Sequence, residues 1–456
     1  MTRSGLGVFA LVVIALAAAG LAVLRCEGAP PSVRAPERIA LGRAARSVAV
    51  EVEDPGSGVR EVAAVLVHPG GEAPLASREF PFRWRLPFVG AQPPVERVEI
   101  AIDPQALGLK EGAATLRISA RDHSWRNWLA GNQTRVEVPI ALDFHPPRIT
   151  LQPANSYERR GGAGAVVYEV SEETARDGVE VGDRFFPSVR PGGSDADRHA
   201  PGPRFALFPL PIDAPPEAKP TVVAVDASGN EARAYPQVHV TERSFAEVQL
   251  PLSPRFMDEK IPELAGIVGV DASNHLKAFQ EINTRIRAEN EARVREVVKD
   301  SAPEPLFSGA FEQLANSKVT SSFAEHRSYL VDGQKVSESR HYGYDLAALA
   351  STPVTASNAG RVLFAGDNGV YGNCVILDHG LGVSSLYGHL SSIEVQPGDK
   401  VEKGQRIGLS GQTGLAGGDH LHFAILLDGV YVDPVEWWDG KWVREHVEEP
   451  LAAAKH

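Results

Sequence analysis

The sequence predicts a mainly β protein with an N-terminal transmembrane helix, two immunoglobulin-like β-sandwich modules, a helical connector and a β-dominated C-terminal domain. Short runs of alternating apolar and polar residues recur between turn clusters, which is typical of antiparallel strands. One uncharged apolar stretch and one stretch of helical periodicity predict the helices. At 456 residues the chain is too long for one compact core, so several domains are expected.

The N-terminal segment, residues 1–29, is predicted to be a membrane anchor and linker. Residues 5–24 carry no charge, and about 20 apolar residues match the thickness of a bilayer core. A cleaved signal peptide usually has a shorter apolar core and a cleavage site of small residues, whereas RCEG follows here at 25–28. We therefore expect an uncleaved single-pass helix, with the bulk of the chain exported.

Residues 30–145 are predicted to form β-sandwich module 1. The run VAVEV at 48–52 alternates and ends at the turn residues DPG, 54–56. Further runs of this kind lie at 62–67, 114–118 and 135–138. Strands this short and this evenly spaced favour a sandwich of two sheets.

Residues 146–242 are predicted to form β-sandwich module 2, with strand runs at 166–170 and 222–225. In both modules a strand ends in A-x-D and a Gly-Asn pair follows, which resembles bacterial immunoglobulin-like modules and predicts a tandem repeat. The fold does not fix a role. The modules could bind carbohydrate or a partner, but we favour a spacer role.

Residues 243–300 are predicted to form the helical connector. Ser273 is expected to cap a helix that runs to Lys299, and Pro303 lies just beyond its end. The other face of the helix is rich in Arg and Glu, which indicates a solvated surface. The apolar positions recur mostly three or four apart, as on one face of a helix, and are Leu276, Phe279, Ile282, Ile286, Val294 and Val297.

Residues 301–442 are predicted to form the C-terminal domain, followed by a tail at 443–456. Glycine is frequent, and strand runs lie at 361–364, 374–377 and 422–426. Four histidines and one aspartate occur here in the order H-x-x-x-D, Y-G-H and H-x-H: His341, Asp345, His389, His420 and His422.

Residue chemistry makes this set a candidate zinc site. Two imidazoles and one carboxylate with an open fourth position form a catalytic zinc centre. The two imidazoles left over can move the protons that hydrolysis requires. His420 and His422 open a strand-like run, so both side chains should point to one face. The chain has no His-Glu dipeptide, which excludes the helical H-E-x-x-H site and its glutamate base.

Composition excludes other classes of function. The net charge is −12, with no basic stretch to neutralise phosphates, so no nucleic-acid partner is expected. The two cysteines, Cys26 and Cys374, lie far apart and lack the spacing of zinc ligands. We expect no disulfide, and we expect Cys374 to pack as a small apolar residue.

Around the five residues the sequence resembles the lysostaphin/LytM-type zinc metallopeptidases, which cut peptide bonds in bacterial peptidoglycan. The matching text is HYGYD at 341–345, YGH at 387–389 and HLH at 420–422, with VEKGQRIG at 401–408 between them. The resemblance covers about residues 309–438. One departure is Ala324, where the family usually has glycine.

The resemblance implies a role for each of the five residues and a setting for the chain. His341, Asp345 and His422 would bind one zinc ion, His420 would be the general base, and His389 would stabilise the oxyanion. The substrate would be cross-links or stem peptides of peptidoglycan. The anchor would then lie in the inner (cytoplasmic) membrane, with the bulk of the chain in the periplasm or cell envelope.

Three hypotheses stay open besides an exposed endopeptidase. Some relatives have lost ligands and regulate cell-wall amidases without being enzymes. The two modules could instead make the chain a cell-wall-binding scaffold. Finally, the connector and modules precede the catalytic domain, so they could cover its cleft until a regulatory protein partner moves them.

Overall fold

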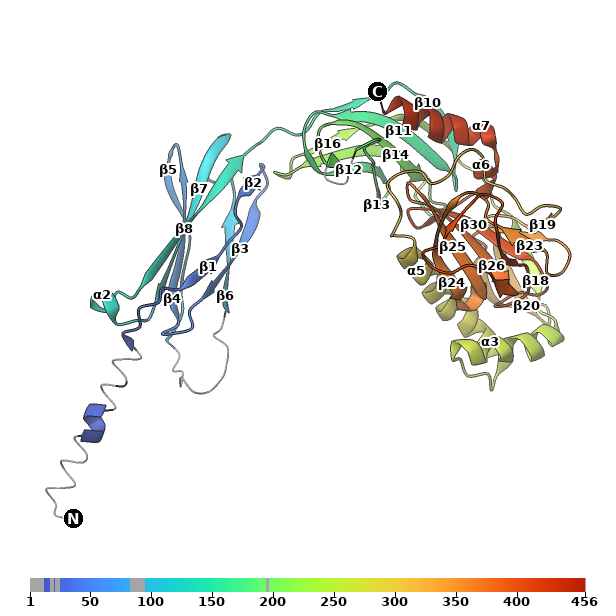
Figure 1. Cartoon of the computed structure of the whole chain (residues 1–456), viewed down its shortest axis with the longest axis horizontal. Coiled ribbons are helices and arrows are strands. Elements are labelled where there is room, and N and C mark those ends of the chain that lie inside the picture. Colours follow the sequence, from blue (N-terminus) through green and yellow to red (C-terminus); the bar gives the residue numbers. More distant parts are fainter. Residues whose placement is uncertain (1–11, 17–19, 21–24, 83–94, 194–196, 456) are drawn as a thin grey trace, which may run out of the picture. The chain divides into compact units, whose positions relative to one another are not determined.

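The computed structural model describes residues 12–16, 20, 25–82, 95–193 and 197–455, and it confirms a mainly β protein (Figure 1). Backbone contacts divide the chain into two compact units, residues 1–147 with 225–231 and residues 148–224 with 232–456. The first unit contains the first β-module. The second contains most of the second module, the connector helices and the C-terminal domain.

The first module consists of a three-stranded sheet, β1-β3-β6, and a five-stranded sheet, β2-β8-β7-β4-β5. Apolar side chains of both sheets share one core, among them Val50 and Ile100 from the first sheet and Leu66 and Ile118 from the second. The elements are β1 (Ser32–Arg34), β2 (Ile39–Leu41), β3 (Arg46–Glu53), β4 (Val59–His68), β5 (Gly71–Glu79), β6 (Val95–Ile102), β7 (Gly112–Asp122), α2 (Arg126–Leu129) and β8 (Gln133–Leu142).

The second module has sheets in the orders β14-β11-β9 and β13-β12-β15-β16, and a parallel pair, β10-β17. Its core includes Tyr168, Val179, Phe208 and Val222. The strands are β9 (Ile149–Leu151), β10 (Asn155–Arg159), β11 (Ala163–Val170), β12 (Thr174–Val181), β13 (Arg184–Pro187), β14 (Gly202–Pro209), β15 (Thr221–Asp226), β16 (Glu231–Ala234) and β17 (Gln237–Thr241).

The two A-x-D…G-N patterns make the same hydrogen bonds. Asn132 donates from its backbone N to Asp122 Oδ1 at 2.7 Å and from Nδ2 to Asp122 Oδ2 at 2.8 Å. Asn230 makes the same two bonds to Asp226, both at 2.9 Å. In each case a buried carboxylate closes the loop that follows the strand. The immunoglobulin-like assignment of the modules stays a prediction.

The connector begins with strand β18 (Glu247–Pro251), which pairs in parallel with β20 of the C-terminal domain. Helical residues follow in η2 (Phe256–Lys260), α3 (Ile261–Val268), α4 (His275–Glu281), η3 (Ile282–Ile286) and α5 (Arg287–Val297). The predicted cap at Ser273 was wrong, because Asn274 accepts the hydrogen bond from the backbone N of Lys277 at 3.0 Å. Ser273 instead donates its hydroxyl to Asp271.

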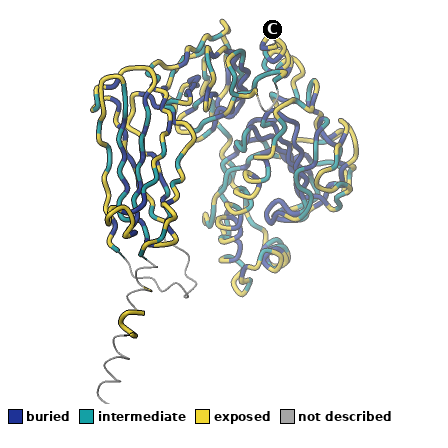
Figure 2. The backbone as a smooth tube through the Cα atoms, turned by 60° about the vertical axis from the view of Figure 1, so that its left-hand side comes forward, coloured by how far each residue is buried: buried dark blue, intermediate teal, exposed yellow. Residues whose placement is uncertain are grey.

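The C-terminal domain is built on an antiparallel sheet in the order β19-β22-β30-β26-β25-β24-β28, with β31 beside β30. Its central strands β26 and β30 are buried along their whole length (Figure 2). The elements are β19 (Lys318–Ser321), β20 (His326–Val331), β21 (Gln334–Arg340), β22 (Tyr344–Ala347), β23 (Pro353–Thr355), β24 (Gly360–Asp367), η4 (Gly369–Tyr371), β25 (Asn373–Gly380), β26 (Val383–Leu390), β27 (Ser392–Ile393), β28 (Lys400–Val401), β29 (Arg406–Leu409), β30 (Leu421–Leu427) and β31 (Val430–Val432).

The C-terminal segment after the sheet is helical. It comprises α6 (Pro434–Trp438), α7 (Gly440–Val443), η5 (Arg444–Glu448) and α8 (Glu449–Ala453). Val447 and Leu451 are buried in the same apolar core as the central strands. The segment predicted as a tail is therefore folded, and η5 and α8 contact β11 of the second module.

The predicted membrane anchor lies mostly outside the described residues. Residues 12–16 are helical and exposed. In the part of the chain that the structure describes, no helix has the length and apolar character needed to span a bilayer. The anchor and the localisation therefore stay predictions.

Candidate active site

Three neighbouring strands bring the five predicted residues together. Asp345 on β22 lies opposite His422 on β30, and His422 in turn lies opposite Gly388 on β26. His389 follows Gly388 directly, so the pairing of β26 with β30 carries it to the same place. The sheet thus assembles residues that are up to 77 positions apart in the chain.

His341 reaches the site from outside the sheet. The strand β22 begins only at Tyr344, so His341 precedes the strand that carries Asp345. His341 is held instead by backbone bonds to the preceding turn, from its N to Glu325 O and from Ala324 N to its O. Ala324 adopts φ of 63°, the left-handed region that glycine enters at least cost.

The potential ligand atoms of His341, Asp345 and His422 lie almost in contact. His341 Nε2 is 2.9 Å from Asp345 Oδ1 and 3.0 Å from His422 Nδ1, and His422 Nδ1 is 3.0 Å from Asp345 Oδ1. All three residues are buried. Two nitrogens and one oxygen that converge in this way form a set that a single metal ion can bind.

The surroundings of the three residues support metal binding. His341 Nδ1 donates to the carbonyl of Ser322 at 2.9 Å, which places the proton of the neutral ring on Nδ1. His341 Nε2 then faces the Asp345 carboxylate with a lone pair, and two acceptors this close need a proton or a cation between them. Arg327 donates from Nη2 to the other carboxylate oxygen, Oδ2, at 2.8 Å and so fixes the orientation of Asp345. The donor set and its outer hydrogen bonds fit zinc.

His420 and His389 lie beside the three ligands. Each donates from Nδ1 to a backbone carbonyl at 2.8 Å, His420 to Gly418 and His389 to Thr413. Their ring centroids are 4.7 Å apart. His420 Nε2 lies 3.5 Å from Asp345 Oδ1. Because each Nδ1 is fixed as a donor, the Nε2 atoms are left to take up or release a proton.

Burial and mutual charge separate the pKa values of these groups. Burial disfavours the charged form of Asp345, but the surrounding histidines, His341 first, outweigh it and hold the pKa of the carboxyl well below its usual range. Burial lowers the pKa of His422 to about 4 and brings that of His389 well below its usual value. Burial acts in the same direction on His420, but the hydrogen bond and charge of Asp345 prevail and raise its pKa. Of His389, His420 and His422, His420 is therefore the one whose pKa is raised.

A close approach to the His422 ring depends on Gly343. A Cβ on Gly343 would lie 2.5 Å from the carbonyl oxygen of Phe423 and 2.7 Å from Cε1 of His422. Any larger residue here would push against β30 and against a ligand ring. The glycine in HYGYD thus makes room for the site.

The five residues line a cavity of about 330 Å³. The domain adds Arg327, Tyr329 and Tyr371 to its wall, and the connector adds residues from 250–256 together with Phe279 and Arg287. The sequence pattern placed Phe279 on the apolar face of a helix but gave no sign that it reaches the site. The connector residues reach the cavity because β18 pairs with β20, a strand far from it in the sequence.

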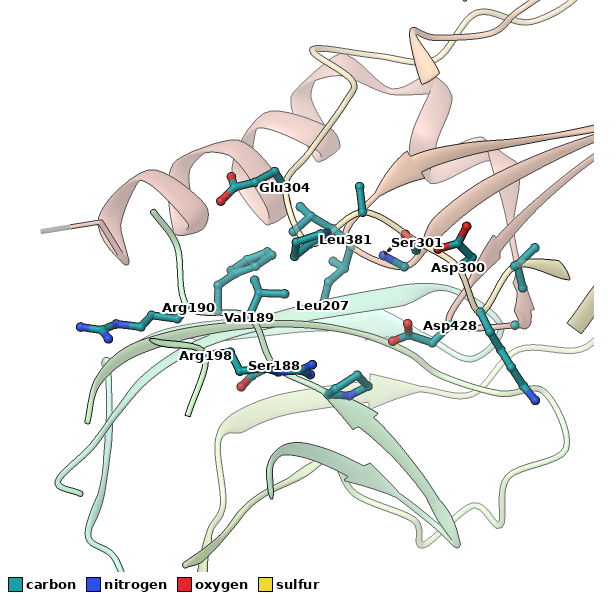
Figure 3. A pocket seen from close by; sticks show the side chains of 18 of the residues that line it. Ser188, Val189, Arg190, Arg198, Leu207, Asp300, Ser301, Glu304, Leu381 and Asp428 are labelled. Carbon is teal, nitrogen blue, oxygen red and sulfur yellow. Dashed lines mark hydrogen bonds between the residues drawn. The ribbon is translucent and has the colours of Figure 1, made fainter. Parts of the chain in front are cut away.

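A second cavity, of about 900 Å³, contains none of the five residues (Figure 3). It lies between the second module, which contributes Val189 and Leu207, and the C-terminal domain, which contributes Leu381 and Asp428. Its charged side chains are of both signs, including Arg190 and Asp300. This cavity takes no part in the chemistry of the five residues.

Comparison with known proteins places the five residues in a family context. Residues 339–434 match the model of peptidase family M23. The chain is 44% identical over 95 residues to the DD-carboxypeptidase/endopeptidase Mpg of Neisseria meningitidis, which is 21% of this chain and 22% of that protein. It is 44% identical over 89 residues to the peptidoglycan DD-endopeptidase ShyA of Vibrio cholerae, or 20% and 21% of the two chains.

Among solved structures, the catalytic domain of the antimicrobial peptidase lysostaphin from Staphylococcus simulans is 30% identical, with a TM-score of 0.24. The match covers 29% of this chain and 98% of that domain. The chain thus covers only about a fifth of the length of the two curated relatives.

Proposed function

Residues 339–434 form a peptidase family M23 domain, and from this premise we propose that the chain is a zinc-dependent endopeptidase of bacterial peptidoglycan. Its substrates are peptide cross-links or stem peptides. The observation that carries the proposal is the convergence of His341, Asp345 and His422 beside two further histidines in one cavity. The names of the relatives support the choice of substrate.

One zinc ion would be held by His341 Nε2, Asp345 Oδ1 and His422 Nδ1, the atoms that face one another. Zinc in such a site lowers the pKa of a water ligand to about 7 and polarises the scissile carbonyl. Arg327 keeps Asp345 oriented, and the carbonyl of Ser322 keeps His341 in the tautomer that offers Nε2.

His420 is proposed to be the general base. Its Nδ1 proton is committed to the carbonyl of Gly418, so Nε2 can accept a proton from the attacking water. The nearby Asp345 charge, which raises the pKa of His420, stabilises the imidazolium that forms. The same Nε2 can then release the proton to the leaving amine.

His389 is proposed to stabilise the negative charge that develops on the carbonyl oxygen of the substrate. Its Nδ1 proton is held by Thr413, so Nε2 becomes a donor only when the ring is protonated. Burial lowers the pKa of His389, and a developing oxyanion nearby would raise it and favour uptake of a proton from water in the cleft. His389 thus responds to charge that appears during the reaction.

The setting of the enzyme is part of the proposal. We place the chain in the inner membrane through residues 1–29, with its site in the periplasm or cell envelope. A regulatory protein partner that displaces the connector is a further proposal, and it is motivated by the connector residues that line the cavity.

The experiment uses purified full-length protein and defined muropeptides, with products identified by mass spectrometry. Hydrolysis of a peptide bond is expected, it should stop after treatment with a strong chelator, and stoichiometric zinc should restore it. His326→Ala is the matched control, because His326 lies at the surface and pairs with Glu247. Hydrolysis that survives complete zinc removal would refute the metal mechanism. Failure to bind zinc, together with stimulation of an amidase, would favour a regulator.

A further inference from the structure

One wall of the cavity comes from outside the M23 domain. Leu250, Leu252 and Phe256 of the connector line it together with Phe279 and Arg287 from the long helix. These residues lie between 250 and 287, whereas the family match begins at residue 339. This wall therefore lies outside the residues that match the family model, and Arg287 is its only charged member among the described lining residues.

Arg287 is held in place by a buried amide. Its Nε and Nη2 donate to Asn283 Oδ1 at 3.2 and 2.8 Å. Asn283 is only 2% exposed, and its Nδ2 donates to Ser337 Oγ at 2.8 Å and to Glu338 O at 3.1 Å on β21. The guanidinium is thus fixed to the domain through a neutral group, and its hydrogen bonds in the described residues engage no carboxylate.

The other arginines near Arg287 have carboxylate partners. Arg327, the second guanidinium of the cavity, pairs with Asp345 at 2.8 Å. Arg285, two positions before Arg287 on the same helix, pairs with Glu281 at 2.6 Å and Glu289 at 2.7 Å. Arg287 forms no ion pair within the part of the chain that the structure describes.

Arg287 is also close to the reacting centre. Arg287 and Tyr371 line the same cavity. The Tyr371 ring in turn packs against His422, with centroids 5.5 Å apart. Arg287 therefore lines the cavity that also contains a proposed zinc ligand, His422. Burial raises the pKa of Glu291, and the positive charge of Arg287 acts against this rise, but the two residues do not form an ion pair.

We propose that Arg287 binds a carboxylate of the substrate, so that the cleft selects peptides carrying a free carboxylate close to the scissile bond. This inference rests on the proposed function, and it assigns Arg287 to specificity and not to catalysis. A fixed guanidinium can bind a carboxylate through two parallel hydrogen bonds, and Nη1 of Arg287 has no partner among the described residues. Stem peptides that end in a carboxylate have the required chemistry.

The test measures binding separately from hydrolysis. Full-length, zinc-loaded protein carrying His420→Ala is titrated with a stem pentapeptide, either with free carboxylates or with the same carboxylates converted to amides. Amidation is expected to weaken binding about tenfold, the lower end for a charge-assisted pair in a half-exposed site. In the Arg287→Gln variant the acid should bind about tenfold more weakly, and the two forms should bind alike.

Two controls separate specificity from a structural role. Arg285→Gln alters a neighbouring, paired arginine and should preserve the preference for the acid. Arg287→Lys should retain part of the preference that Arg287→Gln loses, because lysine keeps the positive charge but lacks the planar guanidinium group. Melting temperature and zinc content should be unchanged in Arg287→Gln.

Undiminished preference for the acid in Arg287→Gln would overturn the proposal. Equal binding of both peptide forms, or no binding of either, by the protein with Arg287 would also overturn it. The proposed function fails on a different result, namely absence of zinc-dependent hydrolysis when His420 is present. The two failures are therefore distinguishable.

Discussion

Gly343→Ala tests the geometry of the zinc site through a single methyl group. The added Cβ would lie 2.5 Å from Phe423 O, 2.7 Å from His422 Cε1 and 2.9 Å from His422 Nε2. All three distances are below van der Waals contact, and one of the contacted atoms is backbone, so either β30 or the ring of His422 must move. Overpacking of this kind costs about 1–3 kcal/mol. If this cost falls on the position of the His422 ring, zinc affinity falls about 5- to 140-fold, since about 1.4 kcal/mol corresponds to a tenfold change.

Gly388→Ala is the matched control, because it places a methyl group near the same histidine. Its Cβ would lie 3.4 Å from His422 Cβ and 3.3 Å from Tyr371 O, distances that need a shift of only a few tenths of an ångström. Zinc affinity is measured by competition with a chromophoric chelator, and stability by thermal unfolding of the zinc-free protein. Gly343→Ala should lose affinity well beyond the loss in Gly388→Ala. Equal affinities in the two variants would refute the packing argument.

Three further predictions follow from the site, the core and the N-terminus. His420→Ala should lower kcat by about 10²–10⁴ while zinc stays bound, as expected for a lost general base; unaltered turnover in steady-state assays would exclude this role. His379 is fully buried, and burial lowers its pKa from 6.5 to about 4, so the unfolded chain binds the proton first as the pH falls. Stability should therefore be intact above pH 6.5 and fall by about 2 kcal/mol from pH 7 to pH 5 in urea unfolding, with a shallower loss in His379→Gln. Deletion of residues 1–29 should release the protein from the membrane fraction, and release of the full-length chain by high salt alone would argue against a spanning helix.

The strand pattern could be predicted because it depends on local periodicity. The run at 48–52 lies within β3, and that at 114–118 lies within β7. The Asp122–Asn132 and Asp226–Asn230 pairs were visible as a repeated motif, although their hydrogen bonds were not. The helix cap was misplaced by one residue, because Ser273 and Asn274 are both good caps and only the backbone conformation distinguishes them.

The five site residues could be listed from the sequence, but their mutual positions depend on strand pairing across long separations. The spacing rule for His420 and His422 holds because they flank the start of β30. It does not describe His341, which lies before β22 and is positioned by backbone bonds to Ala324 and Glu325. Local periodicity therefore cannot predict the position of His341, because this residue precedes the strand.

The connector shows most clearly which features cannot be predicted from local sequence patterns. Its long helix was predicted from apolar spacing, and the charged side chains on the opposite face indicated only a solvated surface. Arg285 fits that description, because it pairs with acids one turn before and after it. Arg287 does not, since β18 joins the connector to β20, and Asn283 ties the start of α5 to β21. Two arginines that look equivalent in the sequence therefore differ in what surrounds them. A guanidinium with a neutral partner inside a reactive cleft can bind a substrate carboxylate, whereas one with two acidic partners on an exposed face cannot do so without breaking a pair.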